Sequence, residues 1–434
     1  MHRKLLVSVF SIAVLSLGVP GFAVTPTTRR ISVSSAESQG DNYSQASLGG
    51  AVSSDGRFVV FTSVATGLVP GDTVGTFDVF LRDRQRGITR LVSVNSAEVK
   101  ANAASGPVSI SADGRFIVFD SVASNLVGND TNGQLDVFIR DRTKGITKRI
   151  SVNSAEVQGN AGSYDASISP DGRFVVFSSD AANLVGNDTN AVGDVFIRDR
   201  MHGTTRRISL NSAEVEGNAS SVGGRISADG RLVVFRSMAA NLVAGDTNAV
   251  PDVFLRDRGT GRTRRLSMSS AGVQANDESD DPRISGDGRF VVFESNATNL
   301  VPGDVNGTWD VFIRNLAARR TKLVSVNSAE LRGNGASLDA GISAAGRYVV
   351  FSSGSTNLVG ADTNGSNDIF LRDRRAGTTR RISRTAGGAE ADGPSFTPSI
   401  TPNGRFVVFT SAAPNLVSGD TNGYDDVFIR GPLR

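Results

Sequence analysis

The sequence predicts an all-β protein, a seven-bladed β-propeller of four-stranded antiparallel blades. Three observations lead to this prediction. A 58-residue repeat occurs in seven copies, each copy contains four short strand patterns, and the strand missing from the last copy stands near the start of the chain. Internal repeats of roughly this length are typical of propellers and solenoids. We expect the N-terminal strand to pair into the last blade and to close the ring.

The first 23 residues have the pattern of a signal peptide. A basic start (MHRK) precedes an apolar run from Leu5 to Val19, and Gly21-Phe22-Ala23 offers small residues for cleavage. The run is shorter than the ~20 apolar residues that a membrane-spanning helix needs. We therefore expect residues 24–434 to form the propeller and the protein to be secreted or periplasmic, with no transmembrane segment after cleavage. The chain has no cysteine, which excludes disulfides and a lipid anchor of the lipoprotein type.

The repeat is marked by the pair Gly-Arg, at residues 56, 114, 172, 230, 288, 346 and 404. Around each pair the text runs S-x-D-G-R-F-V-V-F, A-x-N-L-V-x-G-D-T-N, D-V-F-I/L-R-D-R and R-R-I-S, with variations. In the third copy we expect strands at Ala166–Ser169, Arg173–Ser178, Asp194–Arg200 and Thr205–Leu210. The second of these is continuously apolar, which is typical of a strand covered on both faces. Pro170-Asp171-Gly172 and Met201-His202-Gly203 are turn signals between the paired strands.

The two ends of the chain complete each other. The sequence stops at DDVFIRGPLR (425–434), after the third strand of the seventh copy. The segment TTRRISVSSAE (27–37) matches the fourth strand of an internal copy, TTRRISLNSAE (204–214). This fourth strand carries Arg-Arg or Lys-Arg pairs such as Arg206-Arg207. We expect them at the solvent-exposed edge of the blade, where charge prevents pairing with other chains.

The two faces of the ring are expected to differ. In an antiparallel blade, the loop between the second and third strands lies at the same end as the crossing to the next blade. We therefore place the D-T-N loops on one face, together with the crossings NSAEVQGN (153–160), NSAEVEGN (211–218) and NSAELRGN (327–334). Such loop faces commonly bind ligands. This is the predicted ligand face.

The repeated motifs S-P/A-D-G-R-F-V-V-F, D-V-F-I/L-R-D-R and R-I-S resemble the WD40-like repeats of TolB-type propellers. The resemblance covers essentially all of the chain after the signal segment. It implies a propeller of four-stranded blades that is exported and used for binding. TolB proteins carry an N-terminal α/β domain with no counterpart in this sequence. The fold is therefore expected to carry over, and the partner in the Tol system is not.

The D-T-N loops place oxygen-bearing side chains at positions one, three and seven of a short segment. Calcium prefers six to eight such oxygens, so these loops are candidate Ca²⁺ sites, although the distal glutamate of an EF-hand is missing. The alternative, which we favour, is that Asp and Asn side chains stabilise the turns themselves. The candidate residues are Asp130, Asn132, Asp136, Asp188, Asn190, Asp194, Asp246, Asn248, Asp252, Asp304, Asn306, Asp310, Asp362, Asn364, Asp368, Asp420, Asn422 and Asp426.

Charge and composition restrict the chemistry. Loss of the signal segment would remove two of the 46 basic residues and none of the 43 acidic ones, so no nucleic-acid partner is expected. His202 is the one histidine that would remain, and cysteine is absent, so thiol catalysis and multi-histidine metal sites are excluded. Nearly identical repeats also argue against a single catalytic site. We therefore expect no enzymatic activity.

Three aromatic residues on the predicted ligand face depart from the repeat: Phe77 in copy one, Trp309 in copy five and Tyr424, taken to be at the same place in copy seven. They are candidate ligand contacts, although each could equally cover the end of the core. Copy five also adds an acidic cluster at 277–281, which could attract cations or simply be solvated.

The leading hypothesis is an exported, non-catalytic binding or scaffold propeller, acting as a monomer on an envelope protein or an extracellular glycan. A calcium-stabilised carbohydrate-binding propeller is the first alternative. A carboxylate-based glycan-active enzyme is the second.

Overall fold

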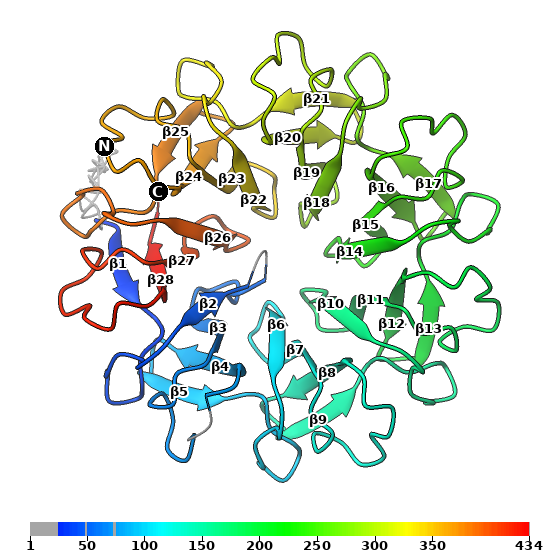
Figure 1. The fold of residues 1–434 in the computed structure, drawn as a ribbon, viewed down its shortest axis with the longest axis horizontal. Coiled ribbons are helices and arrows are strands. Elements are labelled where there is room, and N and C mark those ends of the chain that lie inside the picture. The colour runs from blue at the N-terminus through cyan, green and yellow to red at the C-terminus, as the bar shows by residue number, and fades with distance from the viewer. Residues whose placement is uncertain (1–24, 48–49, 73–74, 434) are drawn as a thin grey trace, which may run out of the picture.

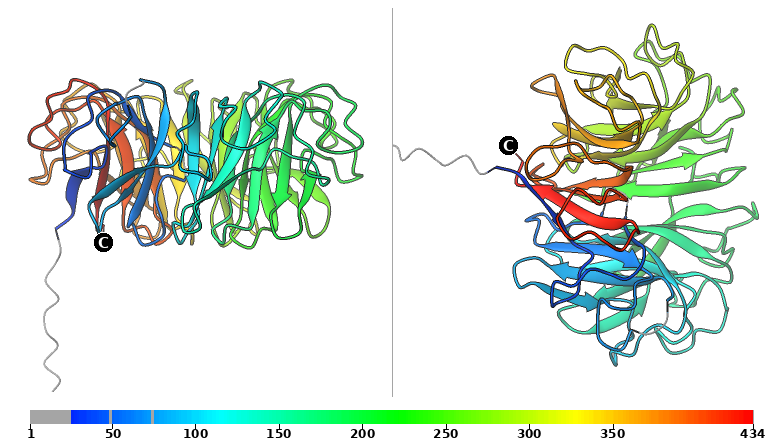
Figure 2. Two further views of the ribbon diagram at one scale, coloured as in Figure 1. Left: turned by 90° about the horizontal axis from the view of Figure 1, so that it is seen from below. Right: turned by 60° about the vertical axis from the view of Figure 1, so that its left-hand side comes forward.

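The computed structural model describes residues 25–433 apart from 48–49 and 73–74. These residues form seven four-stranded antiparallel sheets arranged as a ring (Figure 1), and the ring is a flat disc when seen from the side (Figure 2). The predicted seven-bladed propeller is therefore confirmed. The predicted signal peptide, residues 1–23, lies outside the described residues.

The strands of each blade follow the chain from the centre of the ring outward in blades one to six. Blade one contains β2 (Ser44–Ala46), β3 (Phe58–Ser63), β4 (Asp78–Asp83) and β5 (Ile88–Leu91). Blade two contains β6 (Ser105–Ile110), β7 (Phe116–Ser121), β8 (Asp136–Asp141) and β9 (Ile146–Arg149). Blade three contains β10 (Ser163–Ile168), β11 (Phe174–Ser179), β12 (Asp194–Asp199) and β13 (Thr204–Arg207).

The remaining blades repeat this pattern. Blade four contains β14 (Ser221–Ile226), β15 (Leu232–Ser237), β16 (Asp252–Asp257) and β17 (Arg262–Arg265). Blade five contains β18 (Ser279–Ile284), β19 (Phe290–Ser295), β20 (Asp310–Asn315) and β21 (Arg320–Leu323). Blade six contains β22 (Ser337–Ile342), β23 (Tyr348–Ser353), β24 (Asp368–Asp373) and β25 (Thr378–Arg381). Blade seven contains β26 (Ser395–Ile400), β27 (Val407–Ser411), β28 (Asp426–Gly431) and β1 (Thr27–Arg30).

The ring closes through the N-terminal strand, as predicted. Strand β1 pairs antiparallel with β28 from Thr27 opposite Gly431 to Arg30 opposite Phe428. The two ends of the described chain therefore lie side by side in one blade (Figure 1). Because β1 supplies the outermost strand of blade seven, all seven sheets have four strands, and blade seven joins the two ends of the chain non-covalently.

The core lies between neighbouring blades, because each sheet is apolar on both faces. Each blade contributes one phenylalanine from its second strand and one from its third, such as Phe177 and Phe196, whose ring centroids are 5.9 Å apart. Both rings are fully buried. Separate clusters of buried residues fill each interface, and Phe174, Val176 and Val233 belong to the one between blades three and four. Continuous apolar strands thus produce the stacked blades that the sequence predicts.

The turn glycine of the D-G-R motif is required for two reasons. Gly172 has a φ of +74°, and a Cβ atom there would lie 2.4 Å from the ring of Phe116 in the preceding blade. Any other residue would be strained in that backbone conformation and would also collide with its neighbour. The regular Gly-Arg spacing in the sequence therefore records a contact between blades.

The inner strands begin earlier than predicted. Strand β10 starts at Ser163, three residues before the predicted start, and its register with β11 shifts between Tyr164 and Ser167. A β-bulge interrupts the alternation of side chains at this point, which hides the first half of the strand from pattern analysis. The bulge residue, Asp165, has a φ of 54°.

The crossings between blades lie only partly on the predicted face. In the crossing at 153–160, the Asn160 side chain accepts a hydrogen bond from the N–H of Ala182 in the next loop, at 2.9 Å, as predicted. The tip of the crossing instead runs along the outer strand of the next blade, where the Ser154 hydroxyl accepts from Thr205 N–H at 3.0 Å. Glu156 therefore lies at the outer rim and pairs with Arg198. A glutamate that looked like part of the ligand face joins two blades.

Candidate functional site

A buried arginine lies between the two loop carboxylates of blade two. Arg149 Nη2 is 3.1 Å from Asp130 Oδ2, and its Nε is 3.4 Å from Asp136 Oδ2. All three side chains are at least nine-tenths buried. Asn132 donates from Nδ2 to Asp136 Oδ2 at 3.2 Å and accepts from Gln134 N–H at 3.0 Å. The predicted metal ligands of this blade are thus held together by side chains of the protein itself.

The same arrangement occurs in every blade. In each of the others one cation lies within 4.0 Å of both carboxylates. These groups are Arg30 with Asp420 and Asp426, Lys100 with Asp72 and Asp78, Arg207 with Asp188 and Asp194, Arg265 with Asp246 and Asp252, Arg332 with Asp304 and Asp310, and Arg381 with Asp362 and Asp368. The loop amides of Asn190, Asn248, Asn306, Asn364 and Asn422 donate to the second aspartate as Asn132 does.

The cation comes either from the outermost strand of the blade or from the crossing that follows it, and each blade uses one of these two positions. Five blades use an arginine in the outermost strand. Blade one has Leu91 at that position, and there Lys100 from the following crossing occupies the site. Blade five has Leu323, and Arg332 from its crossing does the same. A positive charge between the carboxylates is therefore kept when the residue that carries it changes.

These contacts correct one expectation about the outer strands. The second arginine of each pair, such as Arg207, is buried with a side chain only 4% exposed, because the loop carboxylates attract it inward. The aspartate that ends the neighbouring third strand pairs with a different arginine. Asp199 pairs with Arg173 of the D-G-R turn at 2.7 Å. Only the first arginine of the pair, here Arg206, stays exposed at the edge.

Calcium binding at these loops stays a prediction. In blade six the carboxylates of Asp362, Asp368 and Glu390 are close enough together to hold one ion, and Arg381 contacts all three. Burial raises the pKa of Asp368 to about 6, whereas Ser383 and Arg381 act to lower it. An arginine already supplies the positive charge that a cation would bring, which favours the turn-stabilising interpretation.

The three aromatic candidates do not occupy equivalent places. The carbonyl oxygens of Phe77, Trp309 and Asp425 each accept a hydrogen bond from the first residue of a following inner strand, at 2.8–2.9 Å. Asp425 is therefore the counterpart of Phe77 in blade seven. Tyr424 stands one residue earlier, at the place of Thr308, so the predicted equivalence of Tyr424 with Trp309 is wrong.

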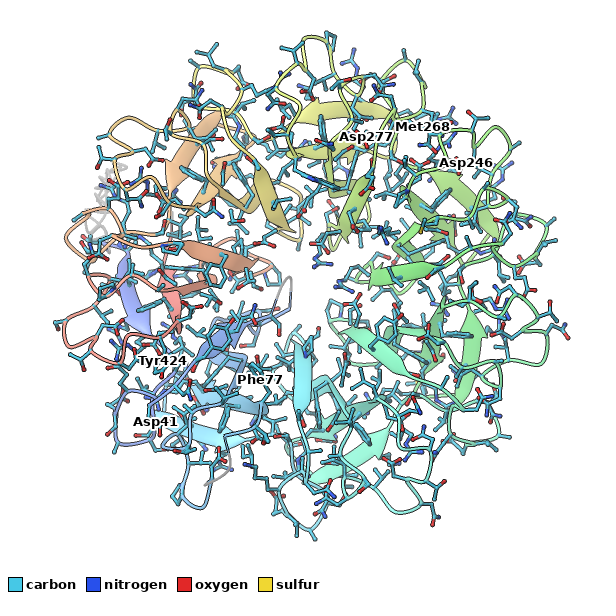
Figure 3. The ribbon with its side chains drawn as sticks, viewed as in Figure 1. Asp41, Phe77, Asp246, Met268, Asp277 and Tyr424 are labelled. Atoms are coloured by element: carbon cyan, nitrogen blue, oxygen red, sulfur yellow. The ribbon has the colours of Figure 1, made fainter. Side chains whose placement is uncertain are left out.

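Of these aromatics, Phe77 lies towards the centre of the ring. Figure 3 labels it nearer the axis than Tyr424, which lies further out on the same side. Phe77 is 41% exposed and packs edge-to-face against Tyr43, with centroids 6.1 Å apart. Tyr424 is 47% exposed and Trp309 is half-buried.

Phe77 lines a pocket of about 550 Å³ at the centre of the ring, which we call the channel pocket. One wall is apolar and comes from blades one and two, where it includes Pro107, Val122 and Leu135. The opposite side is charged and comes from the inner strands of blades three to five, together with Asp120 of β7 in blade two. Trp309 and Tyr424 lie outside this pocket. A pocket with an apolar wall and a few convergent polar groups is the usual form of a ligand site.

The charged side of the channel pocket is built from the bulged inner strands. Asp165 and Asp281 are bulge residues with φ values of 54° and 43°. Arg225 and Arg283 stand two residues beyond the bulge in β14 and β18. Arg225 Nη2 donates to Asp165 Oδ1 and Arg283 Nη2 lies near Asp281 Oδ1, each at 2.8 Å. Bulges with strained residues often accompany functional sites because they re-aim side chains.

Several polar atoms of this cluster have no partner among the described residues. Arg283 is 4% exposed, and its Nε and Nη1 are buried without a hydrogen bond. Asp281 Oδ2 and Asp120 Oδ1 are in the same state. Unpaired buried polar atoms are rare because each costs about 1–3 kcal/mol. Both donors and acceptors are therefore available to a polar ligand.

Burial strongly perturbs the carboxyl group of Asp120 in this cluster. It belongs to β7 and is 2% exposed, and its Oδ2 accepts from Asp165 N–H at 2.9 Å. Burial raises its pKa to about 8, and the charge of Asp165 acts in the same direction. Burial likewise raises the pKa of Glu294 well above its usual value, together with the charges of Asp281 and Asp339.

The comparisons with known proteins concern the fold. No protein-family model matches this chain, and no curated protein matches it by sequence. An oligogalacturonate lyase in complex with manganese superposes with a TM-score of 0.57 at 12% identity, covering 94% of this chain and 93% of that one. The β-propeller domain of the Trilobed protease from Pyrococcus furiosus does so with a TM-score of 0.52 at 12% identity, covering 85% and 91%. The chain shares the β-propeller fold with these proteins.

A putative TolB from Agrobacterium tumefaciens is also similar, with a TM-score of 0.43 and 15% identity over 80% of this chain and 94% of that one. The propeller fold expected from the repeats is confirmed by the seven four-stranded sheets of the structure itself. At these identities the comparisons say nothing about the ligand.

His202 takes no part in the channel pocket. It lies on the turn between β12 and β13, 60% exposed, with Nδ1 2.9 Å from Asp199 Oδ2. This is the solvated turn position that its sequence neighbours indicate.

The sequence analysis missed the residues of the channel pocket. The sequence does contain a signal for this pocket, because the copies differ at corresponding positions of the inner strands. Asp165 corresponds to Pro107 and Gly223, and Arg283 corresponds to Ser109 and Ser167. The acidic cluster of copy five was noticed but was assigned to a loop. Asp281 in fact belongs to β18 and lines the pocket.

Replacing Asp120 by asparagine should change how stability depends on pH. In the unfolded chain its pKa is near 3.9, and in the folded chain about 8, so folding takes up a proton between these values. The wild type should lose stability as pH rises through this window, by up to about 1.4 kcal/mol per pH unit. Asp120→Asn removes this contribution. Denaturant unfolding at pH 5, 7 and 9 should show the variant gaining on the wild type as pH rises, and parallel profiles would contradict the assignment.

Proposed function

We propose that this chain is an exported, non-catalytic binding propeller that takes its ligand into the channel pocket. The observation that carries the proposal is the loss of sevenfold symmetry at the centre of the ring. The buried interfaces between blades repeat closely, whereas the channel pocket has an apolar wall from blades one and two and a charged side from blades three to five and Asp120. The repeated residues are explained by the packing of the blades. Residues that depart from the repeat and line one pocket therefore indicate ligand binding.

The pocket suits a ligand with an apolar face and hydrogen-bonding groups. Phe77 and Val122 are 41% and 47% exposed and would contact the apolar face. The unpaired nitrogens of Arg283 and the unpaired oxygens of Asp120 and Asp281 would bind its polar groups. A sugar ring in an extracellular glycan has this combination, because its C–H face stacks on aromatic rings while its hydroxyls donate and accept. An envelope protein inserting a polar segment is the other partner expected.

The basis for export is the signal-peptide pattern of residues 1–23. Within the described residues the structure contains no helix of the length and apolar character that a membrane span requires. The signal-peptide pattern supports an extracytoplasmic propeller.

Binding to envelope polysaccharides and to envelope extract tests this proposal. The wild type should bind a component of one of the two, and Phe77→Ala should weaken that binding at least tenfold. Tyr424→Ala is the matched control, because it removes an aromatic of similar exposure on the same side of the ring but outside the pocket. Equal losses in both variants, or none in Phe77→Ala, would exclude the channel pocket as the site.

One observation favours a second candidate, a carboxylate-based glycan-active enzyme. With a pKa of about 8, Asp120 holds its proton at neutral pH, as a general acid must. Turnover on a panel of polysaccharides that is abolished in Asp120→Asn would support this function. Binding without turnover in both proteins would leave the non-catalytic proposal standing.

A further inference from the structure

Five of the seven junctions between blades contain the same ion pair at the outer rim. A glutamate at the tip of the crossing, with a φ of 62° or 63°, pairs with an arginine in the third strand of the next blade. We call it the latch glutamate. The pairs are Glu37 with Arg82, Glu98 with Arg140, Glu156 with Arg198, Glu214 with Arg256, and Glu330 with Arg372.

The junction between blades four and five lacks the latch glutamate but keeps the rest. Gly272, with a φ of 81°, stands in its place. Arg314 still donates from Nη1 to Ser269 O at 3.3 Å and to Thr321 Oγ1 at 2.7 Å. Ser270 still accepts from Thr321 N–H at 3.0 Å, as the serines of the other crossings do. Only the carboxylate is missing, and no acid among the described residues pairs with Arg314.

A second acid is missing from the same blade. In five other blades an aspartate ends the third strand and pairs with the arginine of the D-G-R turn, as Asp199 does with Arg173. Blade five has Asn315 at this position. Its outer strand and turn add exposed Arg319, Arg320 and Lys322. The rim of blade five is therefore basic, whereas blades one to four and blade six keep both of these ion pairs.

The missing acids leave a pocket of about 580 Å³ at the rim, which we call the rim pocket. The corresponding pockets at the junctions of blades one and two and of blades two and three measure about 210 and 250 Å³, and each includes a latch glutamate. The lining of the rim pocket contains no acidic residue. It contains Arg264, Arg314 and Arg319 together with Leu266, Met268 and Leu316. Figure 3 labels Met268 on the outer side of the ring, away from the channel pocket.

Three cations of the rim pocket, Arg264, Arg314 and Arg319, form no ion pair with an acid among the residues that the structure describes. A fourth lining arginine, Arg265, pairs with Asp246 and Asp252. Burial lowers the pKa of Arg314, and the positive charges of Arg264 and Arg319 lower it further. A half-buried group of like charges without a counter-ion stabilises any anion that enters.

Blade seven provides a comparison within the same chain. Gly388 replaces its latch glutamate, with a φ of 89°. There Arg384 folds back over the turn and donates from Nε to Gly388 O at 2.7 Å. Its guanidinium lies beside the place that a side chain at Gly388 would take. A side chain of the protein therefore lies beside this place in blade seven, whereas no atom beyond the chain neighbours lies within 4 Å of a Cβ built at Gly272 in the junction of blades four and five.

We propose that the rim pocket between blades four and five binds a carboxylate ligand, whose acid group takes the place of the missing latch glutamate on Arg314. An arginine at this position binds a carboxylate through Nη2, as the five filled junctions show. Leu266, Met268 and Leu316 contact the remainder of the ligand. This site is separate from the channel pocket and does not depend on the function proposed for it.

The test uses glutarate, which carries the carboxylate of a glutamate side chain, and glutaramide as its uncharged match. Calorimetric titration of the full-length protein should show glutarate binding with a Kd on the order of 1 mM and no binding of glutaramide. Gly272→Glu should place a carboxylate of the protein itself on Arg314, because five glutamates already adopt a positive φ at the corresponding position. It should weaken glutarate binding at least tenfold. Arg319→Gln, at an exposed residue, should weaken it by several-fold.

Gly388→Glu is the charge-matched control, because it adds the same acid to the corresponding turn of blade seven. It should bind glutarate as the wild type does. Equal binding by the wild type and Gly272→Glu would overturn the proposal, as would absence of binding to the wild type at 50-fold the expected Kd. Tighter binding of inorganic phosphate than of glutarate would overturn the assignment to a carboxylate. Circular dichroism of each variant verifies that it is folded.

Discussion

Replacing Arg149 by leucine should lower the free energy of unfolding by about 3–5 kcal/mol, the cost of leaving a buried charge without its partner. Arg149 is the cation between Asp130 and Asp136, and all three side chains are buried. Lys148→Leu is the control, because Lys148 precedes it in the same strand but is exposed. The control should change the stability by no more than about 0.5 kcal/mol. Urea unfolding measures both.

Changing Gln158 to lysine should then restore most of the lost stability. The double variant Arg149→Leu with Gln158→Lys reproduces the arrangement of blade one, where Leu91 and Lys100 occupy the two positions. There Lys100 Nζ lies 2.8 Å from Asp78 Oδ2. A double variant no more stable than Arg149→Leu would show that the cation is not what holds this loop.

Thermal melting of the wild type with and without a chelator tests the calcium hypothesis. If arginine and lysine provide the charge between the loop carboxylates, the melting temperature of the wild type should not change. A fall on chelation, restored by Ca²⁺, would show that these loops also hold metal.

A chain that begins at Ser38 should fail to form a stable ring. It lacks β1, which is the outermost strand of blade seven. It also loses buried Ile31 and Val33, each worth about 1.5–3 kcal/mol, and leaves Asp420 and Asp426 without Arg30. Together these losses are comparable with the 5–15 kcal/mol by which a typical domain is stable. Thermal melting followed by circular dichroism should show a large fall or no cooperative transition.

A peptide of residues 25–37 added in excess should restore part of the stability of the shortened chain, because the contacts of β1 are non-covalent. A scrambled peptide of the same composition should not. If the shortened chain melts at the temperature of the complete one, ring closure by β1 contributes nothing to stability.

Much of the architecture could be predicted from the sequence because it depends on local patterns. Strand length, continuous apolar segments such as Phe174–Phe177 and the tight turn at Pro170-Asp171-Gly172 are all set by near neighbours. The same pattern then recurs in seven copies, because every blade packs against its two neighbours in the same way. The closing strand could be identified because residues 27–37 match the fourth strand that the seventh copy lacks.

Three features were decided only by the tertiary structure. The partners of the loop carboxylates come from strands 13 or more residues away or from the next crossing, so composition alone could not distinguish an arginine site from a calcium site. The bulges at Asp165 and Asp281 break the alternation that pattern analysis relies on. The channel pocket and the rim pocket are created where different blades meet, and no single repeat contains either of them.

The sequence by itself thus determined the repeat, the blade and the closure of the ring, because these follow from contacts within one unit or between identical units. Only the tertiary structure decided what the departures from the repeat mean. Asp165 and Arg225 stand 60 residues apart and meet because neighbouring inner strands converge on the axis of the ring. The physical reason is that burial and electrostatics depend on distance in space, which a repeating sequence specifies only after the ring has closed.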